Sequence, residues 1–123
     1  MLGYVTIGTN DLPRATAFYD ALLKELGASR TFEFERGVAW GSGEGTALGV
    51  VTPFDGQPAS AGNGAMAALQ CESPEEVDRI YAKAISLGAN DEGKPGERWP
   101  GFYAAYFRDL DGNKLNCFVM GAV

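Results

Sequence analysis

Residues 102–120, FYAAYFRDLDGNKLNCFVM, decide the fold of this chain. Two runs of apolar, aromatic and β-prone residues flank the polar segment DLDGN at 109–113. Asp-Gly favours a tight turn, because glycine accepts a positive φ and the aspartate side chain can hydrogen-bond its own backbone. The pattern therefore predicts an antiparallel hairpin, with strands over 102–108 and 114–120.

The start of the chain predicts a strand followed by a helix. Residues 3–9, GYVTIGT, are rich in β-branched residues and predict the strand. Asn10 or Asp11 caps the helix, Pro13 is tolerated in its first turn, and Gly27 ends it with a left-handed conformation. Apolar residues at helical spacing predict its buried face: Leu12, Ala15, Tyr19, Leu22, Leu23 and Leu26.

Three short β-prone runs follow, at residues 31–35, 38–41 and 46–52, separated by turn-forming residues that include glycine. Residues 53–64, PFDGQPASAGNG, are rich in proline, glycine and small residues and have no periodicity. We therefore expect them to connect two halves of the chain.

The second half repeats this order. Residues 65–71 predict a strand, and Ser73 begins a helix as a capping box with Glu76. A shift of 61 residues superposes the Leu-Gly-Ala sequence at 26–28 on the one at 87–89, so the ends of the two helices correspond. Residues 90–101 are polar and predict a ragged strand or a loop before the closing hairpin.

The chain resembles the glyoxalase/bleomycin-resistance/dioxygenase proteins, the vicinal oxygen chelate (VOC) superfamily. The resemblance rests on the opening YVTIGTNDLPRATAFYDALLKELGA and on the closing hairpin. There DLDGNKLN resembles the family's Asp-Pro-Asp-Gly-Asn, two residues, then a metal-binding Glu, but the Glu position holds Asn116. It implies an α+β fold of paired βαβββ modules, with curved mixed sheets around a cavity and helices outside. It also implies one VOC domain over 1–123, with modules at about 1–53 and 65–123 and a linker at about 54–64.

The same resemblance identifies four positions at which metal-using members carry His, Gln or Glu. Here they hold Tyr4, Gly49, Met66 and Asn116, and the chain contains no histidine. A phenol, a thioether and an amide are poor ligands for the divalent ions that prefer imidazole and carboxylate. Asp109 and Asp111 are better explained by turn hydrogen bonds. We therefore expect no metal and no other cofactor.

Strand parity then suggests the walls of the cavity. If Tyr4 and Met66 face inward, alternation brings Thr6, Ala68 and Gln70 to the same side, and Asn116 brings Phe118. Trp40, Trp99 and Tyr103 are further candidate walls, because they are aromatic and lie near strand ends or loops. The alternative is that these side chains fill the cavity and form part of the hydrophobic core. Arg98 either meets an anionic group or is a surface arginine.

Composition excludes several classes of partner. Ten basic against sixteen acidic residues give a formal charge of −6, which disfavours nucleic acid. No apolar run is long enough to cross a bilayer and no signal peptide is visible, so we expect a cytoplasmic protein. Cys71 and Cys117 lie in predicted strands, and we expect both to be buried thiols.

Three functions compete at this stage. The first is a metal-independent module, similar to the bleomycin-resistance branch, that binds an unidentified small molecule, and the resemblance implies a homodimer. The second is a lactoylglutathione lyase-type or dioxygenase-related enzyme, for which Tyr4, Tyr103 and Glu35 are the available bases. The third is a structural or regulatory dimer whose cavity is filled by its own side chains.

Overall fold

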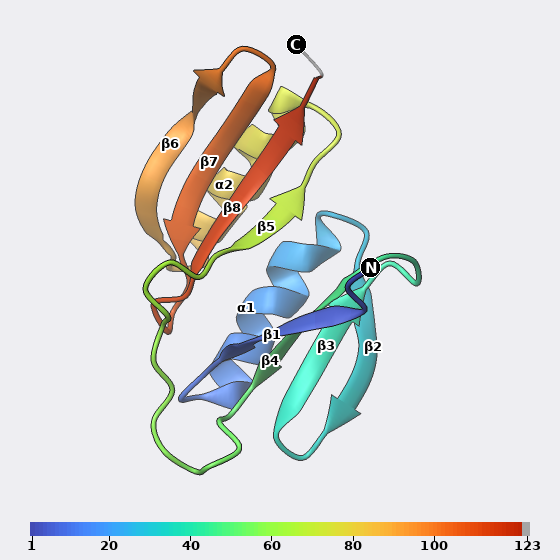
Figure 1. Ribbon diagram of the computed structural model, residues 1–123, viewed down its shortest axis with the longest axis vertical. Helices are drawn as coiled ribbons and strands as arrows, with labels where there is room; N and C mark the ends of the chain where they lie inside the picture. Colours follow the sequence, from blue (N-terminus) through green and yellow to red (C-terminus); the bar gives the residue numbers. More distant parts are fainter. Residues whose placement is uncertain (122–123) are drawn as a thin grey trace. The chain divides into compact units, whose positions relative to one another are not determined.

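The computed structural model of the protein describes residues 1–121, which form two compact units, Met1–Ala61 and a second unit that begins at Gly62. Each unit contains a strand, a helix and three further strands (Figure 1). The N-terminal unit comprises β1 (Tyr4–Gly8), α1 (Leu12–Lys24), β2 (Ser29–Phe34), β3 (Gly37–Gly41) and β4 (Ala47–Val51). The C-terminal unit comprises β5 (Ala67–Gln70), α2 (Pro74–Ser86), β6 (Asn90–Trp99), β7 (Phe102–Arg108) and β8 (Lys114–Met120).

The two sheets have the same topology, with strand orders β1-β4-β3-β2 and β5-β8-β7-β6. In each sheet the first strand pairs parallel with the last, and the remaining pairs are antiparallel. A parallel pair needs a long crossover, which the helix and the two following strands provide. The predicted α+β fold of two βαβββ modules is therefore confirmed.

The helices begin where side-chain caps satisfy their first backbone N–H groups. The Asp11 carboxylate accepts from the Arg14 N–H at 3.0 Å, and the Ser73 hydroxyl accepts from the Glu76 N–H at 3.1 Å. The Glu76 carboxylate reaches back to the Glu72 N–H at 2.9 Å, one residue earlier than in a standard capping box. Gly27 follows α1 with a φ of 76°, as the sequence predicts.

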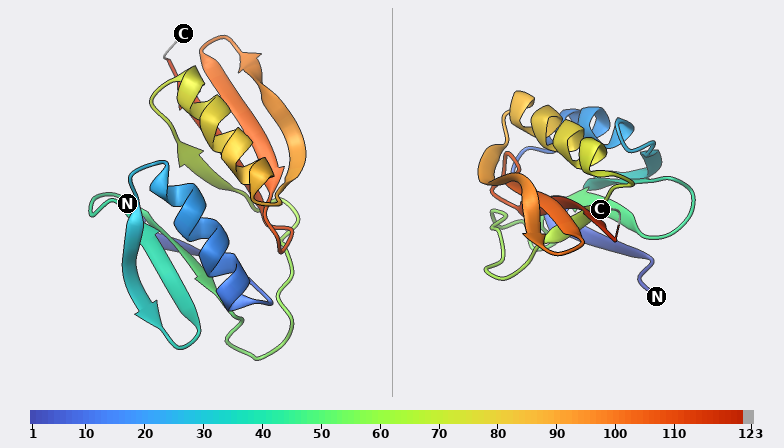
Figure 2. Two further views of the ribbon diagram at one scale, coloured as in Figure 1. Left: turned by 180° about the vertical axis from the view of Figure 1, so that it is seen from behind. Right: turned by 90° about the horizontal axis from the view of Figure 1, so that it is seen from above.

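In the N-terminal unit, α1 covers one face of its sheet and the core lies between them (Figure 2). Trp40 and Leu48 are paired across β3 and β4 on this face and are buried with Val50. They pack opposite the apolar side of the helix, where Tyr19 lies 5.7 Å from Trp40 between ring centroids. The helix contributes these buried apolar side chains: Ala15, Phe18, Tyr19, Leu22 and Leu23.

The C-terminal unit is built in the same way. Alternate residues of β7 and β8 face α2, and both Ala105 and Cys117 are completely buried there. The Cys117 thiol approaches the Val77 carbonyl oxygen at 3.6 Å. Burial raises the pKa of Cys117 to about 12 and that of Cys71 to about 11, so both thiols are held in the unreactive protonated form. Their predicted burial is confirmed.

The segment predicted as a ragged strand or a loop is the strand β6. It pairs antiparallel with β7, but its register shifts between Asp91 and Gly93, between Gly93 and Gly96, and between Glu97 and Trp99. Proline and glycine interrupt the alternation that would mark a regular strand in the sequence. The bulges therefore explain why the sequence pattern is weak there.

Within residues 1–121, neither helix has the length and apolar character needed to cross a bilayer.

Candidate functional site

The sheet of the N-terminal unit carries a hollow of about 750 Å³ on the face opposite α1. Alternation places Thr6, Ala39 and Gly49 on this face, and the pairings Thr6–Gly49 and Ala39–Gly49 align them across three strands. We call this hollow the sheet-face cavity. The residues that line it are Gly3, Tyr4, Thr6, Thr31, Phe32, Phe34, Arg36, Ala39, Ala47, Gly49, Val51 and Phe54.

The hollow exists because small residues occupy the middle of the face. Ala39, Ala47 and Gly49 leave space above β3 and β4, and a Cβ added to Gly49 would lie 3.2 Å from the Thr6 methyl carbon. Large aromatic residues surround this space and are exposed, with Phe32 at 62% and Phe54 at 89%. A small-residue floor with an aromatic rim is typical of a small-molecule pocket.

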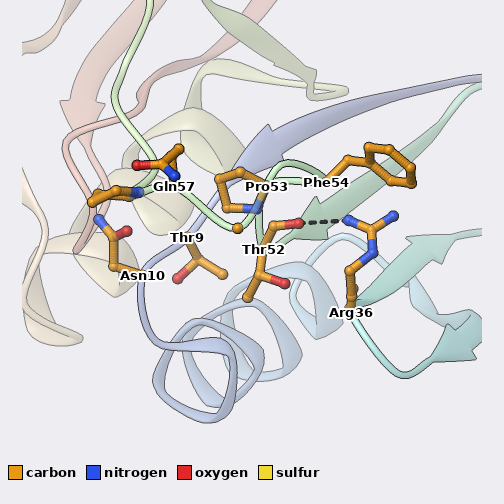
Figure 3. Close-up of a pocket in the computed structure, with 9 residues that line it drawn as sticks. Thr9, Asn10, Arg36, Thr52, Pro53, Phe54 and Gln57 are labelled. Carbon is orange, nitrogen blue, oxygen red and sulfur yellow. Dashed lines mark hydrogen bonds between the residues drawn. The ribbon is translucent and has the colours of Figure 1, made fainter.

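Arg36 lies at one side of the cavity, where it is held by three contacts. Its Nη1 donates to the Thr52 carbonyl oxygen at 2.7 Å. The guanidinium carbon lies 5.4 Å from the centre of the Phe34 ring and 5.3 Å from that of Phe54. Figure 3 shows the guanidinium beside Phe54, with the hydrogen bond to Thr52. Two aromatic faces and one carbonyl therefore fix the cation in place.

Arg36 and Phe54 also line a second, smaller pocket of about 400 Å³ in the same unit (Figure 3). The segment after β4 forms much of its wall and is fixed by Asn10. The Asn10 side chain accepts from the Ala59 N–H at 2.6 Å and donates to the Ala59 carbonyl oxygen at 3.1 Å. This pair of bonds holds the end of the segment against the start of α1.

In the C-terminal unit, the sheet face opposite α2 carries Asn116. Strand pairing places Asn116 between Ala68 of β5 and Tyr106 of β7. The Asn116 side chain is 2% exposed, and its Oδ1 has no hydrogen-bond partner in the described part of the chain. A buried acceptor without a donor costs free energy, so the Asn116 side chain is expected to destabilise the folded state.

Aromatic rings cover the neighbouring part of the same face. Trp99 stacks on Phe102 with ring centroids 4.3 Å apart, and Phe102 lies 5.8 Å from Phe118. Arg98 lies over the Tyr106 ring at 5.2 Å and donates to the carbonyl oxygens of residues 94 and 96. Two of the Arg98 donors thus bind acceptors on its own strand, which favours the surface-arginine alternative over contact with an anionic group.

The structure separates the nine sequence-predicted site residues into three groups. Tyr4 and Thr6 line the sheet-face cavity. A second set belongs to the C-terminal unit, on or beside the sheet face that carries Asn116: Met66, Gln70, Trp99, Asn116 and Phe118. Trp40 and Tyr103 lie on the helix-covered faces.

The prediction that Trp40 and Tyr103 are cavity walls is corrected by strand parity. Trp40 is 2% exposed, and its indole N–H donates to the Asp20 carboxylate of α1 at 2.8 Å. The Tyr103 hydroxyl donates to Asp78 of α2 at 2.7 Å. Successive side chains of a strand point to opposite faces, so a position near a strand end does not tell which face a ring joins.

Sequence reasoning missed Phe32, Phe34, Arg36 and Phe54. A signal existed for the first two, because TFEFER alternates phenylalanine with glutamate, and the phenylalanines must then share the face opposite the glutamates. Phe54 belongs to a Pro/Gly-rich segment without periodicity, so nothing local predicts its position. Arg36 lies in the short turn between β2 and β3, where the sequence carries no signal for a site.

The four positions that the resemblance assigns to metal ligands do not fit a metal here. Tyr4 offers a phenol, Gly49 no side chain, Met66 a thioether and Asn116 an amide. Within residues 1–121, His, Cys, Asp and Glu nowhere gather in a group of three or more that could hold an ion. The donor set therefore gives no basis for a metal-assisted step.

Comparison with known proteins places the chain in a family. Residues 1–117 match the Glyoxalase/Bleomycin resistance protein/Dioxygenase superfamily. No curated protein matches the chain. Among solved structures, a glyoxalase/bleomycin resistance protein from Albidiferax ferrireducens T118 is 38% identical, with a TM-score of 0.89 over 96% of this chain and 97% of that one. A putative glyoxalase from Bacillus halodurans is 27% identical, with a TM-score of 0.78 over 96% and 94% of the two chains.

A lactoylglutathione lyase from Agrobacterium tumefaciens shares the fold, with a TM-score of 0.69, at 21% identity over 96% of this chain and 92% of that one. The family match spans nearly the whole chain, and the similar structures are covered almost from end to end. The protein therefore belongs to the glyoxalase/bleomycin resistance protein/dioxygenase superfamily.

Proposed function

We propose that this protein binds a small, largely apolar molecule in the sheet-face cavity of its N-terminal unit, without a metal at the family's ligand positions. The observation that carries the proposal is the hollow of about 750 Å³ with a floor of small residues and a rim of exposed aromatic rings. Its size lies within the range of ordinary ligand pockets, about 300–1,000 Å³.

The exposed rings explain why a ligand would bind. Phe32, Phe34, Phe54 and Tyr4 each keep more than 40% of their surface in water. Removing a large apolar side chain from water contributes about 1.5–3 kcal/mol, and contiguous exposed apolar surface commonly marks a binding site. A ligand that covers two of these rings would gain most of its affinity from them.

The other readings receive less support. A structural or regulatory dimer with a cavity filled by side chains does not agree with the hollow above Ala39 and Gly49. For the lactoylglutathione lyase-type or dioxygenase-related alternative, the hydrogen bond to Asp78 raises the pKa of Tyr103, which makes it a poorer candidate for a base at neutral pH. The names of the related structures describe those proteins and do not identify a ligand for this one.

Binding of a neutral fluorescent probe tests the proposal. Nile red brightens when it leaves water, and we expect saturable binding by the wild type that Phe32→Ser weakens at least about tenfold. Phe32 is exposed, so the substitution leaves the core intact. Ile85→Ser is the matched control, because Ile85 is also partly exposed but belongs to α2. Equal affinity of the Phe32→Ser variant and the wild type would refute the proposal.

A further inference from the structure

One positively charged side chain lines the sheet-face cavity. Of the described residues that line it, only Arg36 carries a charge, and Arg36 also borders the smaller pocket in the same unit. No carboxylate within residues 1–121 lies within ion-pair distance of Arg36.

Arg30 and Arg108 are differently placed, because carboxylates pair with them. Arg30 pairs with Asp20 at 2.6 Å and with Glu33 at 2.9 Å, and Arg108 pairs with Glu92 at 3.1 Å. A guanidinium has five N–H donors, whereas the hydrogen bond recorded for Arg36 uses one of them, to Thr52. Arg36 therefore retains donor capacity beside a ligand-sized hollow.

The surroundings of Arg36 also pre-organise it. The rings of Phe34 and Phe54 lie within 5.4 Å of its guanidinium carbon, and the Thr52 carbonyl holds one end of the fork. A cation fixed beside apolar surface loses little side-chain freedom on binding, and its attraction for an anion is less screened than in open water. The remaining donors are thus available for a planar anion.

We propose that the ligand is an apolar or aromatic carboxylate, whose carboxylate binds Arg36 while its apolar body covers the rings of Phe32 and Phe34. This inference rests on the proposed function and adds the chemical class of the ligand. A monoanion matches a single guanidinium in an otherwise uncharged cavity, whereas a phosphate dianion would require further cations. The planar fork of arginine also matches the two oxygens of a carboxylate.

A pair of probes that differ only in charge tests the proposal. 2-Naphthoate and 2-naphthamide share a ring system and shape, and each is titrated to displace Nile red from the wild type at neutral pH. We expect naphthoate to displace the dye at a concentration at least about tenfold lower than naphthamide, as for a charge-assisted hydrogen bond in a partly dry site. In Arg36→Gln we expect this preference to vanish while naphthamide still binds.

Two further variants serve as controls. Arg14→Gln removes the same type of side chain from α1, which covers the opposite face of the sheet, and should keep the preference for naphthoate. Arg36→Lys keeps the charge but loses the fork, and should retain a smaller preference. Circular dichroism of each variant checks that it folds. If Arg36→Gln does not fold, the Arg36→Lys variant tests the assignment instead: a reduced preference for naphthoate supports it, and an unchanged preference overturns it.

The outcomes separate this inference from the proposed function. If Nile red binds and depends on Phe32, but the two naphthalene probes compete equally or not at all, the cavity stands and the carboxylate assignment fails. A preference for naphthoate that survives Arg36→Gln also overturns the assignment. If Nile red binds the wild type and Phe32→Ser alike, the proposed function fails, and this inference with it.

Discussion

One buried carboxylate, that of Asp109, stabilises the turn of the closing hairpin. Asp109 is 4% exposed, and its carboxylate accepts from the N–H groups of Asp111 and Asn113, both at 2.9 Å, and from the Asn113 side chain at 3.0 Å. Gly112 completes the turn with a φ of 86°. The predicted turn of the segment DLDGN thus depends on one aspartate side chain, which agrees with the structural reading of its acidic residues.

Replacement of Asp109 should destabilise the protein strongly. Asp109→Ala leaves buried donors without their charged acceptor, and we expect the free energy of unfolding to fall by about 2–3 kcal/mol. Urea denaturation monitored by circular dichroism measures the change. Asp111→Ala removes the same charge from the same turn but leaves the Asp109 carboxylate in place, so it should cost much less. Equal losses in the two variants would contradict this account of the turn.

Asn116 should behave in the opposite way. Its Oδ1 is buried without a donor, so Asn116→Leu removes an unpaired acceptor and should raise the free energy of unfolding by about 1 kcal/mol. The matched control is Asn113→Leu, which removes a bond that the Asp109 carboxylate accepts and should lower stability. Urea denaturation compares the two variants. A loss of stability in Asn116→Leu would mean that the amide is satisfied in solution.

At the scale of elements, the alternation of each strand divides core from cavity. In β3, Trp40 joins the core beneath α1 while Ala39 faces the hollow, and in β4 the buried Leu48 and Val50 alternate with Ala47 and Gly49. A shift of one residue would exchange the two faces. The cavity is therefore a property of whole strands, and its volume depends on their small residues.

Filling the cavity should weaken binding without loss of the fold. Ala39→Leu places a larger side chain on the cavity floor, and we expect Nile red affinity to fall at least about tenfold, with stability equal to or slightly above that of the wild type. Fluorescence titration and thermal melting measure the two effects. Ala82→Leu, on the exposed side of α2, makes the same substitution elsewhere and should leave binding unchanged. Retained affinity in Ala39→Leu would argue that the probe binds elsewhere.

The contact between α1 and its sheet carries a titratable group. Asp20 accepts from Arg30 at 2.6 Å and 3.0 Å, and from Trp40 at 2.8 Å. The hydrogen bonds from Arg30, and secondarily that from Trp40, hold the pKa of Asp20 below its ordinary value of 3.8, although burial opposes this shift. Because the folded-state pKa is lowered, the stability that Asp20 contributes is fully present above that ordinary value and is lost as the pH falls through the folded-state pKa.

Asp20→Asn should therefore reduce stability at neutral pH and matter less in acid. After allowance for solvent screening of this partly exposed pair, we expect a loss of about 0.5–1 kcal/mol at pH 7. The difference in the free energy of unfolding between the variant and the wild type should become smaller at pH values below the ordinary pKa of aspartate. Urea denaturation across this pH range measures it. Glu33→Gln, which removes the other acidic partner of Arg30, is the control and should cost less. A gap that stays constant into acid would exclude the ionic contribution.

At the scale of the whole molecule, strand edges favour association. β1 and β2 are the edge strands of the N-terminal sheet, and all six residues of β2 are exposed. Exposed edges tend to pair with another chain, and we propose a homodimer. Sedimentation velocity should then give a mass twice that of the 13.0 kDa chain. A mass of one chain that persists at high protein concentration would contradict the proposal.

The α+β fold of two βαβββ modules is readable from the amino-acid sequence alone. The caps at Asp11 and Ser73, the helical spacing of apolar residues and the turn of the segment DLDGN are local signals, each readable within a few residues. The repetition of the cap, the helix and its Leu-Gly-Ala end indicates two modules. The site, in contrast, depends on the tertiary structure. Which face each ring joins, how Arg36 meets Phe54 from a segment without periodicity, and where small residues align into a hollow all depend on strand register, which forms between residues far apart in the chain.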